Sequence, residues 1–206
     1  MGTGSLSVGT DPRRGFNRLD RFVRRLRSRR VLSHVRPTDR VLDVGCGQEN
    51  WFLVANASRI ASGVGLDPNL LPEFEGSTES VTGFAGTLDA FTASSSDSFD
   101  LITWLAVIEH METDESVRLL TMCRGLLGES GRLLLTTPTP SAKPFLEFLA
   151  FRLGVISRDE IADHKLYLGR ELVGSVLDRA GFSLSHYETF QVGLNSLAVA
   201  TPRRAV

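Results

Sequence analysis

The sequence VLDVGCG occupies residues 41 to 47, and the fold prediction starts from it. A short apolar run that ends in glycines is typical of a buried parallel strand followed by a tight turn. In an open parallel sheet, ligands bind beyond the carboxyl ends of the strands, next to such a turn. We therefore expect a strand here, with a ligand site at its end near Asp43, Gly45 and Gly47.

On both sides of this stretch, segments with strand character alternate with segments of helical periodicity. Alternation of this kind predicts an α/β fold with a Rossmann-like, doubly wound sheet that is mostly parallel. Two consecutive strands at the end of the chain predict a C-terminal antiparallel hairpin. The further strands are expected at residues 63–66, 99–108, 132–136, 182–190 and 196–201, and helices at 51–60, 113–127 and 170–180.

The size and composition of the chain are those of one water-soluble domain. Its 206 residues, 42% of them hydrophobic, can form a substantial core, and no apolar run reaches the roughly 20 residues that a membrane span requires. The first 15 residues lack the apolar stretch of a secretion signal. Cys46 and Cys123 have neither metal-site spacing nor a disulfide-rich context. We therefore expect a cytoplasmic protein.

The beginning of the chain is polar and then strongly basic. Residues 1–12 are rich in Gly, Ser and Thr and predict a flexible tail, which leaves 13–206 as a single domain. Residues 11–40 hold 11 Arg against 3 Asp, a net charge of +8 (11 − 3). Phe16, Leu19, Val23 and Leu26 repeat at helical spacing within this segment. The pattern favours a packed amphipathic helix with solvated arginines over a surface for nucleic acid or anionic lipid.

The acidic residues near the turn indicate what kind of ligand fits. A dinucleotide fingerprint needs a glycine at position 50, where this chain has Asn50. Asp43 would repel a pyrophosphate but would attract an ammonium or sulfonium group. Asp67 follows the next strand and is placed to accept both hydroxyls of a ribose, unless it is only a turn residue before Pro68. Asp89 could meet an adenine edge or lie in an ordinary loop.

Taken together, these motifs resemble the class I S-adenosylmethionine-dependent methyltransferases, small bacterial members in particular, from about residue 16 to 201. The matching segments are VLDVGCG at 41–47, VGLDP at 64–68, LDAF at 88–91, SFDLITWLAVIEHM at 98–111, GRLLLTTPTP at 131–140 and DHKLYLGRELVGSVLDRAGF at 163–182. The resemblance implies a seven-stranded sheet and S-adenosyl-L-methionine as the cofactor. It also implies the cofactor-binding residues Asp43, Gly45, Cys46, Gly47, Asp67, Pro68, Leu88, Asp89, Trp104 and Leu105.

One position departs from the family pattern. The family has a third glycine where this chain has Glu49, so a degenerate cofactor site stays open as an alternative. Two other classes compete with the enzyme: a nicotinamide-dependent oxidoreductase, and a non-catalytic binding or regulatory module that uses the Arg-rich helix to hold nucleic acid.

Methyl transfer needs little covalent assistance, since alignment of the reactants supplies much of the rate. A hydroxyl acceptor also needs a base, for which His110 and His164 are the candidates. Relatives that depend on a metal use a Glu-x-x-Glu-His cluster, in which Ala106 replaces the first glutamate here. We therefore expect no metal in the active site.

An apolar insertion is expected at about residues 139–165, with the phenylalanine-rich sequence PFLEFLAFRLGVI at its centre. It could be a lid over the acceptor, a contact to a membrane surface, a homodimer face, or a helix packed on the domain's own core. As a lid it would close on a small-molecule, glycan or lipid-like acceptor. Nucleic acid is a less favoured partner.

Overall fold

The computed structural model describes residues 18–77, 80–142 and 167–203. The expected N-terminal tail, His164 and all but the first residues of the apolar insertion lie outside these ranges. No helix in the described part of the chain is long and apolar enough to cross a membrane.

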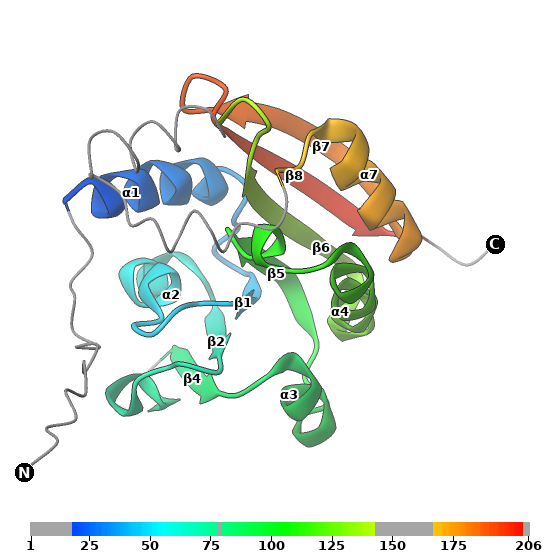
Figure 1. Ribbon diagram of the computed structural model, residues 1–206. Helices are drawn as coiled ribbons and strands as arrows, with labels where there is room; N and C mark the ends of the chain where they lie inside the picture. Colours follow the sequence, from blue (N-terminus) through cyan, green and yellow to red (C-terminus); the bar gives the residue numbers. More distant parts are fainter. Residues whose placement is uncertain (1–17, 78–79, 143–166, 204–206) are drawn as a thin grey trace, which may run out of the picture.

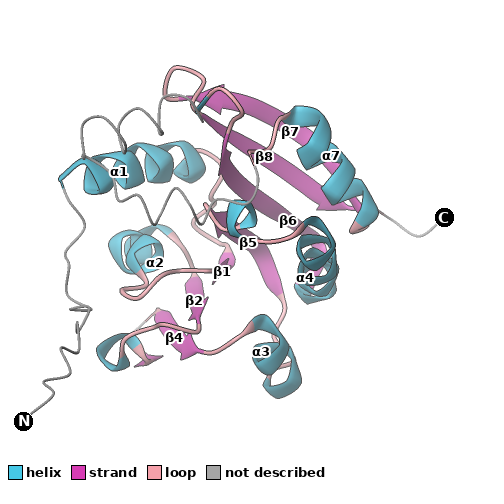
Figure 2. Ribbon diagram, in the orientation of Figure 1, coloured by secondary structure: helices cyan, strands magenta, loops and turns pink. Residues whose placement is uncertain are grey.

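One mixed sheet organises the molecule (Figures 1 and 2). Its strands lie in the order β3-β4-β2-β1-β5-β6-β8-β7. The five strands from β4 to β6 are parallel to one another, whereas β8 runs antiparallel to both of its neighbours. The bounds are β1 Arg40–Val44, β2 Ser62–Asp67, β3 Gly76–Ser77, β4 Val81–Ala85, β5 Phe99–Leu105, β6 Leu127–Pro138, β7 Phe182–Phe190 and β8 Asn195–Pro202.

Helices cover both faces of the sheet, as the doubly wound prediction requires. On one face, α3, α4 and α7 pack over a core that includes Trp104, whereas α1 and α2 cover the other face (Figure 1). The α-helices are α1 Arg18–Leu32, α2 Trp51–Asn56, α3 Leu88–Ser94, α4 Thr113–Leu126 and α7 Arg170–Arg179, and the 3₁₀ turns are η1 Ala57–Arg59, η2 Pro72–Phe74 and η3 Ile108–His110.

The α/β class, the parallel sheet and the C-terminal hairpin are confirmed. Sequence order does not predict which strand of the hairpin adds to the sheet: the last strand, β8, lies between β6 and β7. The burial of the two strands explains this arrangement. The Ser196–Ala200 segment of β8 is buried throughout, whereas β7 exposes many of its side chains, as an edge strand does.

Two short elements lie in segments to which the sequence analysis assigned neither a helix nor a strand. Thr87 caps α3, and its Oγ1 accepts a hydrogen bond from the Ala90 amide at 3.3 Å. Leu88 and Asp89 therefore belong to the first turn of a helix. The two-residue strand β3 pairs antiparallel with β4 at the sheet edge, which raises the count from the expected seven strands to eight.

A buried ion pair connects three segments at the amino end of the parallel strands. Both guanidinium nitrogens of Arg132 donate to the carboxylate of Asp39, at 3.1 and 2.6 Å, and the residues are 8% and 1% exposed. The Arg132 guanidinium also donates to the carbonyl oxygens of His34, at 2.6 Å, and Asp100, at 3.3 Å. The pair therefore fixes the end of α1 against the start of β1 and the middle of β6.

Candidate functional site

The turn after β1 forms the centre of the candidate site. The amides of Gly45 and Cys46 donate to the Leu66 carbonyl at 2.8 and 3.2 Å, which joins the turn to the end of β2. Gly45 and Gly47 both have φ near +75°, a region that side chains disfavour. A Cβ on Gly45 would lie 2.6 Å from Val107 Cγ2. The turn therefore requires glycine and leaves its backbone open to close approach by a ligand.

Asp43 lies beneath this turn as a buried carboxyl group. It is 2% exposed, and Thr103 Oγ1 on the neighbouring strand β5 donates to its Oδ1 at 2.6 Å. Burial raises the pKa of Asp43 to about 7, partly offset by the hydrogen bond from Thr103, and the negative charge of Asp67 raises it further. A cation bound beside this carboxyl would favour its ionised form.

Asp67 lies at the end of β2, next to the turn. Its Oδ2 accepts from the Gly47 amide at 3.0 Å and its Oδ1 from the Asn69 amide at 2.8 Å. Each carboxylate oxygen has a further lone pair that can accept from a ligand hydroxyl. The structure thus brings Asp43, Gly45, Gly47 and Asp67 together at the carboxyl edge of the sheet, as the sequence predicted.

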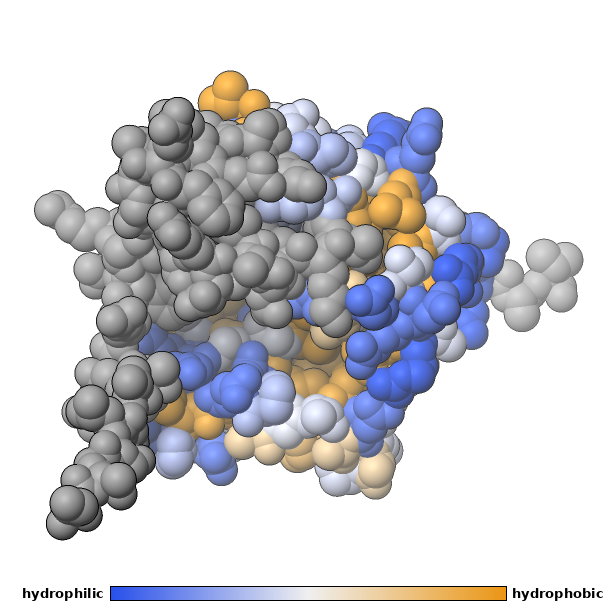
Figure 3. Space-filling view, in the orientation of Figure 1, coloured by the Kyte–Doolittle hydropathy of each residue, from blue (hydrophilic) through white to orange (hydrophobic). Residues whose placement is uncertain are grey.

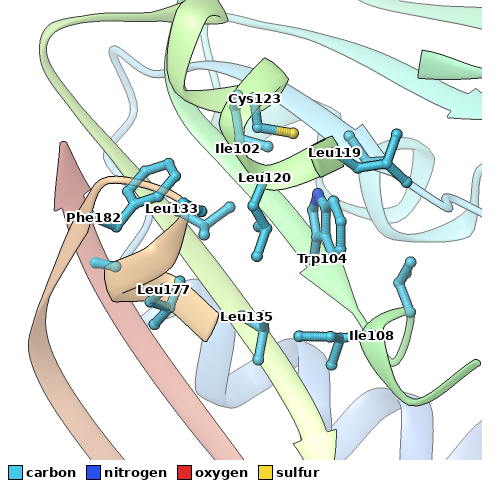
Figure 4. Close-up of a cluster of buried hydrophobic side chains, with 14 of the residues drawn as sticks. Ile102, Trp104, Ile108, Leu119, Leu120, Cys123, Leu133, Leu135, Leu177 and Phe182 are labelled. Atoms are coloured by element: carbon cyan, nitrogen blue, oxygen red, sulfur yellow. The ribbon is translucent and has the colours of Figure 1, made fainter. Parts of the chain in front are cut away.

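The other predicted cofactor residues lie in more varied surroundings. Cys46, Leu88 and Trp104 are buried, Leu105 is half-buried, and Pro68 is exposed. Trp104 is fully enclosed among Leu119, Leu120 and Cys123 (Figure 4). Its indole therefore packs in the core under α4, and its contact with a cofactor stays a prediction.

Asp89 is exposed in the first turn of α3. Its carboxylate accepts from Arg118 at 2.6 and 3.3 Å, and this hydrogen-bonded pairing holds the pKa of Asp89 below its usual range. A contact from Asp89 to an adenine amine, expected from the resemblance, would have to share the carboxylate with Arg118.

At the position of the missing third glycine, Glu49 points to solvent. The neighbouring Asn50 is 1% exposed, has φ of +46°, and its side chain covers Gly65: a Cβ there would lie 2.2 Å from Asn50 Oδ1. In the sequence, Asn50 indicated only that the dinucleotide fingerprint is absent. The structure shows that it also closes the gap between the start of α2 and β2.

Helix α1 contributes two arginines that the sequence analysis assigned to the solvent. Its amino half approaches the glycine turn, since a Cβ on Gly47 would lie 3.8 Å from Arg24 Nη2. Arg27, one turn further along, is partly buried, and its Nε is enclosed. Burial lowers the pKa of Arg27, partly offset by the negative charge of Glu109. The expectation of solvated arginines therefore fails at Arg27.

Glu109 lies in η3, just beyond the end of β5, and is 1% exposed. Burial raises the pKa of this carboxyl group, while the positive charge of Arg27 lowers it. Within the described part of the chain, neither Arg27 Nε nor Glu109 Oε2 has a hydrogen-bond partner. The sequence alone did not pair these residues, and the only signals that could have indicated them are the spacing of arginines along α1 and the position of Glu109 after a strand.

The two histidine candidates differ in what the structure describes. His110 follows Glu109 in η3, is half-buried, and its charge also lowers the pKa of Glu109. His164 lies outside the described residues.

The face of the molecule toward the viewer in Figure 3 is hollowed near its middle, where apolar surface lies between hydrophilic margins.

Comparison with protein families matches residues 13–186 to the methyltransferase domain. The chain belongs to this methyltransferase family. The cofactor of the methyltransferase is accordingly S-adenosylmethionine, as the sequence motifs predicted. A search of curated proteins found no significant match.

Solved structures share the fold of this methyltransferase. They include a SAM-dependent methyltransferase from Archaeoglobus fulgidus (TM-score 0.68, 18% identity, 87% of this chain and 93% of the other covered). Magnesium protoporphyrin IX methyltransferase from Synechocystis, with bound SAH, matches with a TM-score of 0.59 and 17% identity over 89% and 83% of the two chains. SAH-bound CalO1, a methyltransferase in calicheamicin biosynthesis, has a TM-score of 0.59 and 19% identity. The match covers 81% of this chain but only 49% of CalO1, so the methyltransferase spans about half of that protein's length.

The residues at the carboxyl edge of the sheet fit this cofactor. Gly45 and Gly47 provide backbone positions without side chains, and Asp43 provides a buried carboxyl group for the amino group of the methionine part. Asp67, with spare acceptor capacity at the rim, fits the ribose hydroxyls. A buried carboxyl group whose pKa is already raised by burial is well suited to a cationic ligand, because the ligand's charge would offset the cost of ionisation.

Proposed function

We propose that the protein transfers a methyl group from S-adenosylmethionine to a small-molecule acceptor that binds between α1 and η3. In this proposal Arg27 and Glu109 orient polar groups of the acceptor, and Asp43, Gly45, Gly47 and Asp67 hold the cofactor. The cofactor supplies a methyl group on a positively charged sulfur. The chain's own contribution is to align the acceptor with that methyl group and to exclude water.

The observation that carries the acceptor assignment is that Arg27 and Glu109, which have opposite charges, each enclose a polar atom without a hydrogen-bond partner among the described residues. A buried charge costs several kcal/mol unless it is paired and hydrogen-bonded. Among the described residues, Arg27 Nε and Glu109 Oε2 make no hydrogen bond, although each side chain lies in the other's field. Such unsatisfied groups are rare in folded proteins and call for an explanation, which a polar group of a bound acceptor would provide.

This arrangement favours an acceptor with polar or charged groups. Arg27 can donate to a carboxylate, phosphate or carbonyl oxygen, and Glu109 can accept from a hydroxyl or an amine. A glycan or a lipid-like molecule with a polar head group could also bind to Arg27 and Glu109. A protein with a non-catalytic binding role would not need these two residues to orient an acceptor. For a hydroxyl acceptor, the proton passes to His110 or His164, the two candidate bases.

Two variants test the proposal: Glu109→Gln and Arg27→Met. Each should lower methyl transfer from labelled S-adenosylmethionine to a small-metabolite extract by roughly 100-fold, the scale of a lost positioning group. The dissociation constant for S-adenosylhomocysteine should stay within about threefold of wild type, since neither residue holds the cofactor in the proposal. Lipid, glycan and nucleic-acid fractions of the same extract separate the acceptor classes.

The melting temperature distinguishes recognition from structure. If the pair serves only the fold, each variant should leave one buried charge without its partner and melt far below wild type. Full activity in both variants, or a shared collapse of melting temperature and cofactor binding, would contradict the assignment.

A further inference from the structure

Three side chains from distant parts of the chain meet beside the outermost strand β7, on the face of the sheet that α1 covers. His34 follows the end of α1, while His186 and Glu188 belong to β7. The two imidazole rings lie with their centroids 5.5 Å apart, and His186 Nε2 is 3.6 Å from Glu188 Oε2. One ligand atom from each residue can be chosen so that all three lie within 4.8 Å of one another.

From this cluster we propose a binding site for a zinc-like divalent metal ion, with His34, His186 and Glu188 as ligands. Two imidazole nitrogens and a carboxylate oxygen form a ligand set that zinc prefers, with a fourth position open to water. In a tetrahedral zinc site the ligand atoms lie about 3.3 Å apart, so rotamer adjustments of roughly 1 to 1.5 Å would close the cluster. Partly exposed side chains can make such adjustments without moving the backbone.

A β-bulge directs the β7 side chains to this place. The register between β7 and β8 shifts between Leu184 and His186, so Ser185 is an extra residue in the strand. As a result, Leu184 and Tyr187, three positions apart, both pack on the α7 face of the sheet. Bulges re-aim side chains in this way, often at functional sites.

After the bulge, alternation places His186, Glu188 and Phe190 on the other face of the sheet. Phe190 packs there against the core cluster that includes Val31 of α1. An unbroken strand would instead have given His186 the same face as Leu184. The bulge is therefore what brings His186 and Glu188 to His34.

The backbone beneath His34 is also held in place. The His34 amide donates to the Val31 carbonyl at 2.9 Å, and the His34 carbonyl accepts from Arg132 Nη2 at 2.6 Å. Arg132 is itself paired with Asp39. A ligand on a backbone fixed in this way loses little conformational freedom when a metal binds.

Arg30 is the competitor at this site. Its guanidinium donates to Glu188 Oε2, the same oxygen that lies near His186. The Arg30 side chain is 47% exposed, and exposed ion pairs contribute at most about 1 kcal/mol. A divalent ion can therefore displace Arg30 into the solvent, and removal of the Arg30 charge should strengthen metal binding.

This site is separate from the methyl transfer site. His34 precedes β1 and the glycine turn follows it, so the length of β1, roughly 16 Å for five residues, lies between them. A bound metal would connect the end of α1 to the edge strand β7. The same helix carries Arg24 and Arg27, about two to three turns before His34, so the metal would fix the helix that borders the cofactor site.

The test uses the full chain without a polyhistidine tag, treated with a chelator and then titrated with zinc chloride in a calorimeter. We expect one zinc per chain and a higher melting temperature, with no such effect from magnesium. His34→Gln and His186→Gln should each weaken binding by roughly 100-fold or more, since the loss of even a second-shell partner costs 10- to 100-fold. Arg30→Gln should tighten binding severalfold.

The control is His110→Gln, which removes a histidine outside the cluster and should bind zinc like wild type. Absorption of bound cobalt identifies the donors, because nitrogen and oxygen ligands give no thiolate charge-transfer band. Circular dichroism reports whether each variant is folded. Zinc binding that survives in folded His34→Gln and His186→Gln proteins, a thiolate band from Cys46 or Cys123, or no zinc binding by wild type would each overturn the proposal.

Discussion

Buried charged side chains are hydrogen-bonded to different extents at the two edges of the sheet. At the amino edge, the guanidinium of Arg132 makes four hydrogen bonds, to Asp39 and to two backbone carbonyls. At the carboxyl edge, Arg27 Nε and Glu109 Oε2 are equally enclosed but have no hydrogen-bond partner among the described residues. The difference separates two uses of a buried ion: a fully hydrogen-bonded pair holds segments together, whereas an incompletely bonded pair can receive a ligand.

The largest effect is expected from a variant that breaks the hydrogen-bonded pair of Arg132 and Asp39. Asp39→Ala should lower the free energy of unfolding by about 3 to 5 kcal/mol, because it leaves the charge of Arg132 buried without a partner. Urea unfolding followed by circular dichroism measures the loss. Asp97→Ala is the matched control, since the Arg40–Asp97 pair is about half exposed and should contribute less than about 1 kcal/mol. Equal effects of the two variants would contradict the structural role of the buried pair.

The next effect concerns cofactor binding at the carboxyl edge, in a variant whose fold should survive. Asp67→Ala should weaken S-adenosylhomocysteine binding by about 2 to 5 kcal/mol, because one carboxylate accepting two hydroxyls makes two charged hydrogen bonds. Calorimetric titration measures the affinity, and thermal melting checks the fold. If the affinity stays within threefold of wild type, Asp67 serves only the turn, through its bonds to Gly47 and Asn69.

A smaller effect follows from the pKa of Asp43. Burial raises this pKa to about 7 in the free protein, and a bound ammonium group favours the carboxylate, so the bound protein has a lower pKa. Affinity for S-adenosylhomocysteine should therefore rise with pH, by roughly five- to tenfold from pH 6 to 7.5, and level off above the free pKa. Asp43→Asn should bind more weakly with a flat profile. A wild-type affinity that falls over this range would refute the role of Asp43.

The raised pKa of Asp43 also makes the stability of the protein depend on pH. An Asp43 carboxyl group with a raised folded pKa contributes stability that is present below its unfolded pKa of about 3.9 and is lost as pH rises toward 7. Wild type should therefore lose stability relative to Asp43→Asn across this window, which unfolding at pH 4 and pH 7 would measure.

The smallest effect is expected at the position that departs from the family. Glu49→Gly restores the third glycine, and because Glu49 is exposed, cofactor affinity should change by less than about threefold. Asn50 provides the contrast. Its side chain packs against Gly65, so Asn50→Leu should disturb both melting and binding. A gain of tenfold or more in Glu49→Gly would mean that the glutamate hinders the cofactor.

Much of the site could be predicted because its signals are local. The glycine turn and the acidic residues at strand ends depend on backbone conformation within a few residues, so motif and spacing reveal them. The strand order of the hairpin depends instead on which strand can be buried on both faces, a property of the assembled sheet. Trp104 shows the same limit, since its position in a motif does not reveal that the indole packs under α4.

The sequence by itself determined the α/β class, the glycine turn at Gly45 and Gly47, and the carboxylates Asp43 and Asp67, because each follows from local periodicity or from the chemistry of a short motif. Only the tertiary structure decided that Arg27 faces Glu109 and that His34 meets His186 and Glu188. These residues lie far apart along the chain, on elements whose packing depends on the whole sheet. Burial leaves Arg27 Nε without a hydrogen-bond partner among the described residues. A single extra residue in β7 moves His186 and Glu188 to the opposite face of the sheet.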